Sequence, residues 1–457
     1  MIGNMTNSGQ HRTWILVTLA FVIVLGVVAT QSAQARSFTD LYNFTGGSDG
    51  AYPYAGLVRD SGGNLYGTTG SGGSSGFGVV FKLSKNGTET VLHSFVGGLS
   101  DGQYPYGTLA MDAEGNLYGT AAGGGGTGCG GFGCGVVFEV NMSGTETVLH
   151  SFTGGSDGEY PYAELVRDAK GNLYGTAAGG GGTGCGGFGC GVAFKVNKKG
   201  TETVLYSFTG GPTDGCYPHG SLLMDTKGNL YGTTDECGTS DLGTVFKVSK
   251  TGEETVLHSF AGGTTDGDYP FYAGLLMDTE GNLYGNTYYG GASNEGVVYK
   301  LSKKGTLTVL HSFAGGTTDG CYPYGTPAMD TRGNLYGTTE HCGASSYGIV
   351  WKVSNKGKGT VLHSFAGGAS DGEYPVAGVI LDAKDNPYGD TAGGGASDLG
   401  TVYELKQKGT ITLLHSFAGS DGAYPAGSLI WDAKGNLYGT ASQGGSDDYG
   451  TVWKLTP

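Results

Sequence analysis

Three consecutive repeats of this chain carry acidic, amide, phenol and imidazole side chains in corresponding loops, where they depart from the pattern of the other repeats. Such groups could wall a binding site, hydrogen-bond a polar ligand or coordinate a cation. The competing interpretation is drift in exposed loops, which vary more than the elements that they connect. The candidate ligand-binding residues are His219, Asp235, Glu236, Asn286, Tyr288, Tyr289, Glu340 and His341.

The eight cysteines form four pairs, and a repeat that lacks one member of a pair lacks both. This pattern, behind an export signal, predicts four disulfides that each lie within one repeat. Metal ligation is the alternative, and Glu340 and His341 beside Cys342 would help it, but no repeat offers four close Cys or His ligands. The predicted pairs are Cys129 with Cys134, Cys185 with Cys190, Cys216 with Cys237, and Cys321 with Cys342.

Two further polar sets recur in the repeats and favour a structural role. One position holds His93, His150, His258, His311, His363 and His415, with Tyr42 and Tyr206 in the other two repeats. An exchange of imidazole for phenol suggests a packed ring with one polar tip. The segment Asp-Gly-x-Tyr-Pro occurs in all eight repeats and is typical of a turn, although its carboxylates and tyrosines could also bind calcium or stack on sugars. We predict no cofactor, leave calcium open, and assign no metal ligands or catalytic residues, because nucleophile-elbow, phosphate-loop, dinucleotide and zincin motifs are missing.

The elements that must position these groups follow from a repeat. Gly-Asn-Leu-Tyr-Gly, or a close variant, occurs eight times at intervals of 50 to 57 residues. Fixed periods in this range indicate units that bury their apolar faces by stacking on neighbours. Each unit holds four short segments with strand composition, separated by turn residues, and shows no helical period. We name these strands a, b, c and d, and predict an all-β fold.

Four-stranded units in this number predict an eight-bladed β-propeller of antiparallel blades. The first strand d, at residues 41–44, precedes the first strand a, whereas the chain ends after the eighth strand c. We therefore expect the N-terminal strand to complete the last blade and close the ring. The d-to-a and b-to-c connections should share one face, which we call the loop face. The short a-to-b and c-to-d turns should form the other, the turn side. We expect any ligand on the loop face, because short turns leave few large side chains to enclose one.

Composition and the N-terminus indicate the compartment. Residues 1–35 resemble a signal peptide, with an apolar stretch followed by Ala33-Gln34-Ala35, and residues 36–457 would form the propeller. An uncleaved membrane anchor is the alternative. The net charge is −15, which disfavours nucleic acid and anionic membranes as partners. We expect a secreted or periplasmic monomer, with cell-surface association as an option and no membrane contact once the signal is removed.

Three motifs recur together in fixed order: Asp-x-x-Gly-Asn-Leu-Tyr-Gly-Thr, Leu-His-Ser-Phe and Asp-Gly-x-Tyr-Pro. In this respect the chain resembles the Gloeo/Verruco (GloVer) tandem-repeat family of exported bacterial proteins, which implies secretion and a bacterial source. The Asp-x-x-Gly-Asn-Leu-Tyr segment is also similar, more weakly, to blades of gluconolactonase-like and NHL propellers. The former use acidic and Asn residues around a central metal, and no singular residue here matches them.

These observations favour a secreted binding or surface-interaction scaffold with an extracellular glycan or protein as its partner. Exposed tyrosines on the loop face would stack on the glycan. The alternative is a metal-dependent hydrolase or lyase with its site near the propeller axis. Binding spread over similar blades should survive the loss of one loop, whereas an enzyme should fail when a singular site is altered.

Overall fold

A computed structural model describes residues 36–271, 274–375, 377–406 and 409–457. The expected signal peptide at residues 1–35 lies outside the described residues and stays a prediction. No helix within the described ranges is long and apolar enough to cross a membrane.

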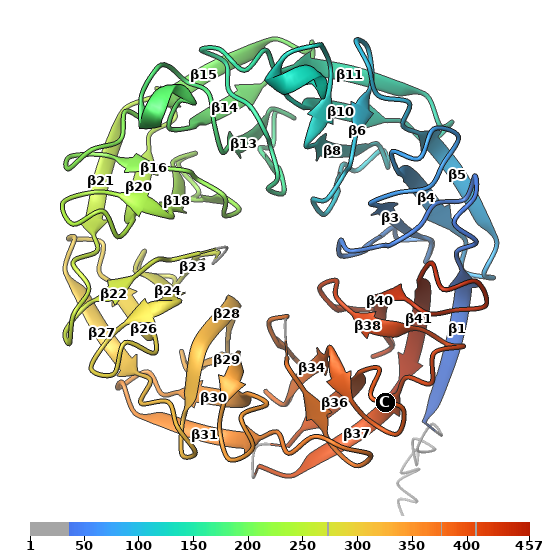
Figure 1. The fold of residues 1–457 in the computed structure, drawn as a ribbon, viewed down its shortest axis with the longest axis vertical. Helices are drawn as coiled ribbons and strands as arrows, with labels where there is room; N and C mark the ends of the chain where they lie inside the picture. The colour runs from blue at the N-terminus through green and yellow to red at the C-terminus, as the bar shows by residue number, and fades with distance from the viewer. Residues whose placement is uncertain (1–35, 272–273, 376, 407–408) are drawn as a thin grey trace, which may run out of the picture. The chain divides into compact units, whose positions relative to one another are not determined.

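The described residues form eight four-stranded antiparallel sheets arranged in a ring, so the predicted eight-bladed β-propeller is confirmed (Figure 1). Blade 1 consists of β2 (Val58–Arg59), β3 (Leu65–Thr69), β4 (Val79–Leu83) and β5 (Glu89–Ser94), and blade 2 of β7 (Ala110–Met111), β8 (Leu117–Ala121), β10 (Val136–Val140) and β11 (Glu146–Ser151). Blade 3 consists of β12 (Val166–Arg167), β13 (Leu173–Ala177), β14 (Val192–Val196) and β15 (Glu202–Ser207), and blade 4 of β17 (Leu223–Met224), β18 (Leu230–Thr234), β20 (Thr244–Val248) and β21 (Glu254–Ser259). Blade 5 consists of β23 (Leu276–Met277), β24 (Leu283–Thr287), β26 (Val297–Leu301) and β27 (Leu307–Ser312), and blade 6 of β28 (Gly320–Met329), β29 (Leu335–Cys342), β30 (Ile349–Val353) and β31 (Gly359–Ser364). Blade 7 consists of β33 (Ile380–Leu381), β34 (Pro387–Thr391), β36 (Thr401–Leu405) and β37 (Ile411–Ser416), and blade 8 of β39 (Ile430–Trp431), β40 (Leu437–Gln443), β41 (Thr451–Thr456) and β1 (Ser37–Asn43).

Small elements decorate the loops. Four two-stranded pairs tie a d-to-a connection to the b-to-c loop of the blade that follows, and β38 extends the sheet of blade 8. The pairs are β6 (Gly102–Gln103) with β9 (Gly123–Gly124), β16 (Gly215–Cys216) with β19 (Glu236–Cys237), β22 (Gly267–Asp268) with β25 (Tyr289–Gly290), and β32 (Gly372–Glu373) with β35 (Gly393–Gly394). The strand β38 spans Ala423–Pro425. The loops also contain two 3-10 turns, η1 (Cys129–Gly131) and η2 (Cys185–Gly187).

The N-terminal strand closes the ring as predicted. In antiparallel register with β41, β1 pairs from Ser37 with Thr456 to Asn43 with Thr451. This pairing gives the last blade its fourth strand and leaves β41 with a hydrogen-bonded neighbour on both sides. Phe38 stacks on His415 with ring centroids 3.5 Å apart, so apolar packing also holds the join.

Aromatic side chains on strand c pack against the glycine of Leu-Tyr-Gly on strand b. A Cβ atom at Gly67 would lie 2.7 Å from the Phe81 ring, and one at Gly337 would lie 2.3 Å from the Trp351 ring. Glycine is needed there because only a bare backbone admits the ring at that distance. The recurrent glycine of the repeat signature is therefore a packing requirement.

The Asp-Gly-x-Tyr-Pro segments join neighbouring blades. All eight tyrosines have a left-handed backbone, with φ between 54° and 61°, which is uncommon for tyrosine. Each tyrosine N–H donates to a b-to-c loop carbonyl of the preceding blade, as Tyr104 does to Phe77 at 3.0 Å and Tyr322 to Glu295 at 2.9 Å. The segment's aspartate contacts the strand-d ring of that same preceding blade, as Asp101 Oδ1 does His93 Nε2 at 3.1 Å. These contacts agree with the structural role expected for both sets.

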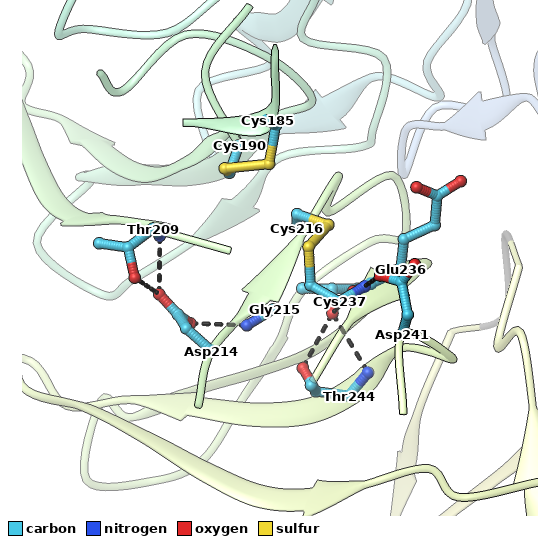
Figure 2. The surroundings of a disulfide bond; sticks show 11 residues. Cys185, Cys190, Thr209, Asp214, Gly215, Cys216, Glu236, Cys237, Asp241 and Thr244 are labelled. Atoms are coloured by element: carbon cyan, nitrogen blue, oxygen red, sulfur yellow. Dashed lines mark hydrogen bonds between the residues drawn. A yellow bond between two sulfur atoms is a disulfide. The ribbon is translucent and has the colours of Figure 1, made fainter. Parts of the chain in front are cut away.

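All four predicted disulfides are formed, with Cα atoms 5.3 to 5.4 Å apart. Cys216 on β16 and Cys237 on β19 join a d-to-a connection to a b-to-c loop, as the expected topology requires. The disulfide between Cys185 and Cys190 of blade 3 lies beside that of blade 4 (Figure 2). The cysteine groups that could suggest a metal site are thus explained by disulfide bonds.

Candidate ligand-binding site on the loop face

Six of the eight candidate residues lie at or just beyond the end of strand b in three neighbouring blades. Glu236 lies on β19, Tyr289 on β25 and His341 at the end of β29. Their loops are held by pairing with d-to-a connections, since Glu236 pairs with Cys216 and Tyr289 with Asp268. The rigid strands and these short pairs fix the backbone from which the side chains project.

His219 and Asp235 form a close pair in blade 4. His219 Nδ1 lies 2.5 Å from Asp235 Oδ2, and Asp235 is only 2% exposed. Burial raises the pKa of Asp235, although the contact with His219 opposes this effect. The His219 ring lies 6.1 Å from the Tyr162 ring of blade 3 and 6.5 Å from the Phe271 ring of blade 5. The pair therefore stands in a row of aromatic side chains that crosses three blades.

Ring contacts connect the loops of blades 5, 6 and 7. Tyr288 stacks on Tyr322 with centroids 4.9 Å apart and an interplanar angle of 11°, and Tyr289 meets the same ring edge-on at 5.5 Å. Tyr322 lies 6.4 Å from His341, which lies 5.7 Å from Tyr374. The contacts form one continuous surface. We call it the aromatic patch and define it as Tyr269, Tyr288, Tyr289, Tyr322, His341 and Tyr374.

Carboxylates border the aromatic patch. Glu340 Oε2 lies 3.9 Å from His341 Nε2, and both side chains are partly exposed. Burial and, next, the charge of Glu340 raise the pKa of Tyr288. Burial followed by the charges of Asp235 and Glu236 raises the pKa of Tyr269. The patch thus combines flat ring faces with hydrogen-bond acceptors, which suits a ligand with apolar faces and hydroxyl or cationic groups.

Asn286 does not join the patch. It is 1% exposed, and neither atom of its amide has a hydrogen-bond partner among the described residues. The buried Tyr299 hydroxyl approaches Gly285, the residue before Asn286. Blade 7 repeats the combination, with Asp390 and Tyr403, whereas blades with Phe or Trp on strand c have Thr on strand b. Asn286 therefore belongs to the interior of blade 5.

Sequence reasoning missed part of the patch. Tyr269, Tyr322 and Tyr374 come from Asp-Gly-x-Tyr-Pro segments, which recur in every repeat; a structural turn was the favoured interpretation, sugar stacking the alternative, and none of the three was named as a site residue. Their rings nevertheless meet the irregular residues of the b-to-c loops. The signal that could have linked the two sets was topological, because the d-to-a and b-to-c connections that carry them were expected on one face.

The turn side also offers an open groove, although its short turns were expected to leave few large side chains to enclose a ligand. A groove of about 1190 Å³ lies on the turn side between blades 3 and 4. Two neighbouring blades supply its walls, so enclosure there does not depend on long loops.

A sequence model of the Gloeobacter/Verrucomicrobia repeat matches residues 24–189, 129–328 and 316–457. The chain therefore belongs to this repeat family. No curated protein matches it.

Several solved structures are similar. A gluconolactonase from Xanthomonas campestris is 15% identical with a TM-score of 0.35, over 66% of this chain and 86% of that one. A protein from Bacteroides uniformis proposed to be a 6-phosphogluconolactonase is 15% identical with a TM-score of 0.46, over 77% and 94%. A protein of unknown function from Dyadobacter fermentans is 13% identical with a TM-score of 0.35, over 71% and 96%.

Proposed function

We propose that this chain is an exported binding scaffold whose aromatic patch takes a carbohydrate ligand. The supporting observation is the continuous run of ring contacts from Tyr288 through Tyr322 to Tyr374, on loops of three blades. Tyrosine faces can stack on the apolar faces of sugar rings, and the bordering carboxylates can accept hydrogen bonds from sugar hydroxyls. Disulfides in the loops of blades 4 and 6 fit an oxidising compartment outside the cytoplasm.

A glycan array followed by titration of each hit tests the proposal. Tyr289 is 36% exposed, so Tyr289→Ala removes a ring with little loss of packing and should weaken binding roughly three- to tenfold. Tyr106 is 43% exposed in the d-to-a connection that leads into blade 2, and Tyr106→Ala is the matched control that should leave affinity unchanged. Lys303→Ala, on the turn side, is the second control. Equal losses in all three variants would contradict a site at the patch.

The second candidate function is a metal-dependent hydrolase or lyase near the propeller axis. The observation that favours it is the singular pair of His219 with the buried Asp235. Thermal shift with added calcium and a substrate screen of hydrolysable glycans would test this function. Two results together would favour the enzyme. His219→Gln would lose the hydrolytic activity, and Tyr289→Ala would bind glycan as the unaltered protein does.

A further inference from the structure

The basic residues of this chain are segregated. Every described Lys and Arg lies in an a-to-b or c-to-d turn, beside such a turn, or at the matching ends of β1 and β41. None of those described lies in the d-to-a or b-to-c connections of the loop face, whereas acidic residues occur on both sides. Although the net charge is −15, the described basic residues are therefore concentrated on the turn side.

The groove between blades 3 and 4 concentrates these cations. The basic residues that line it are Arg167, Lys170, Lys195, Lys227 and Lys250, against two acidic residues, Asp168 and Asp225. Both aspartates serve the tight turns that they begin. Asp168, for example, accepts hydrogen bonds from the backbone N–H of Asn172 at 2.8 Å and from the Tyr174 hydroxyl at 3.1 Å.

Most of the groove's cations have no counter-ion within the described ranges. Arg167 lies 3.7 Å from Asp112, and the Lys195 ammonium lies 5.9 Å from the centre of the Tyr174 ring. Lys170, Lys227 and Lys250 form no ion pair with the described part of the chain. Apolar atoms of Val166, Leu222 and Met224 also line the space.

The neighbouring groove between blades 2 and 3 provides an internal comparison. It occupies about 260 Å³ and contains Glu114 and Glu139. These residues hold the repeat positions that Lys170 and Lys195 hold one blade later. Blade 2 is the exception, because basic residues hold both positions in blades 3, 4, 6 and 8, and the two grooves differ in charge mainly through these two glutamates.

We propose that this groove binds an acidic oligosaccharide. Its volume exceeds what one small anion needs and matches a ligand of several sugar units. Ammonium groups along the walls would pair with successive carboxylate or sulfate groups, while the apolar lining would contact the sugar rings. Carboxylate-bearing and sulfate-bearing chains share this chemistry, and the site does not depend on the aromatic patch.

Calorimetric titration at low ionic strength tests the proposal on the mature chain. An oligogalacturonate probes carboxylate recognition, a heparin oligosaccharide probes sulfate recognition, and a neutral maltooligosaccharide of equal length is the negative ligand. We expect one site per chain for either or both acidic probes and no binding of the neutral probe. A single-stranded oligonucleotide that bound more tightly than both acidic sugars would overturn the assignment.

The decisive variant is the double substitution Lys170→Glu with Lys195→Glu. Because blade 2 carries Glu at both positions, the fold should accept the change, and affinity should fall at least about tenfold. The control, Lys303→Glu with Lys304→Glu in the c-to-d turn of blade 5, changes the net charge equally away from the groove and should retain affinity. Equal loss in both double variants, or retained affinity in the first, would refute a site in the groove. Tyr289→Ala should bind the acidic probe like the unaltered protein.

Discussion

Replacing Asp390 with Asn or Thr should stabilise the protein at alkaline pH. Asp390 lies on β34, is 1% exposed, and neither carboxylate oxygen has a hydrogen-bond partner among the described residues. Thr holds the same position in six blades, and in five of them its hydroxyl donates to a carbonyl of the next blade, as Thr120 does to Ala163 at 3.1 Å. A carboxylate at this position must be desolvated without any such compensation.

The magnitude follows from linkage between protonation and folding. Burial raises the pKa of Asp390 from 3.8 to about 7. Since the folded-state pKa lies above the unfolded value, both states bind the proton below pH 3.8 and there is no penalty. The penalty grows as pH rises from 3.8 to about 7, because the unfolded chain releases its proton first, and it reaches roughly 4 kcal/mol above pH 7.

Differential scanning calorimetry at pH 4 and pH 8 provides the assay. With an unfolding entropy of about 2 cal/mol/K per residue, 4 kcal/mol corresponds to an increase in Tm of about 4 to 5 °C for a propeller of this size. Asp390→Asn should show this increase at pH 8 and almost none at pH 4. Thr338→Asp, which places a carboxylate at the equivalent position of blade 6, should lower Tm more at pH 8 than at pH 4. An unchanged or reduced Tm of Asp390→Asn at pH 8, or equal shifts at both pH values, would refute the reasoning.

Three further predictions follow from the fold. Burial raises the pKa of Glu146 to about 7, so Glu146→Gln should raise Tm by about 1 °C at pH 8 and leave it unchanged at pH 4, after allowance for partial solvent screening; the same gain at both pH values would count against this cause. Deleting residues 37–43 exposes the edge of β41 and should cause aggregation or a clear fall in Tm, whereas a stable monomer would argue against closure by β1. Non-reducing peptide mapping should find the four disulfides within single repeats, and eight free thiols or links between repeats would contradict the pairing.

The fold was predictable because its signals are local and repeated. Turn residues, strand composition and a 50 to 57-residue interval recur eight times, so errors in one repeat are corrected by the others. Ring closure was predictable from a strand d that comes before the first strand a. The disulfides were predictable because Cys216 and Cys237 appear and disappear together, as do the other pairs.

The candidate site was less predictable because its chemistry arises between blades. Asn286 was grouped with surface residues, although a phenol replaces the usual Phe or Trp at Tyr299 of the same blade. Whether a polar side chain on a strand reaches solvent depends on how deeply its position is buried in the blade, and a short stretch of sequence does not reveal that depth. Conversely, Tyr322 was not named as a site residue because its segment recurs in every repeat, yet its ring contacts Tyr288, which occurs once.

Net charge is also a poor guide to what such a molecule can bind. At physiological ionic strength, interactions between exposed charges fade beyond about 8 Å, so a ligand in the groove responds mainly to Lys170, Lys195 and their neighbours. The −15 of the whole chain acts at longer range and slows the approach of an anion only when salt is scarce. Added salt should therefore weaken the binding of an acidic oligosaccharide chiefly by raising its dissociation rate, since the screened contacts are those within the groove. A repeat protein can in this way keep one architecture through every blade, while the charge of each groove depends on the side chains that the two neighbouring blades bring to it.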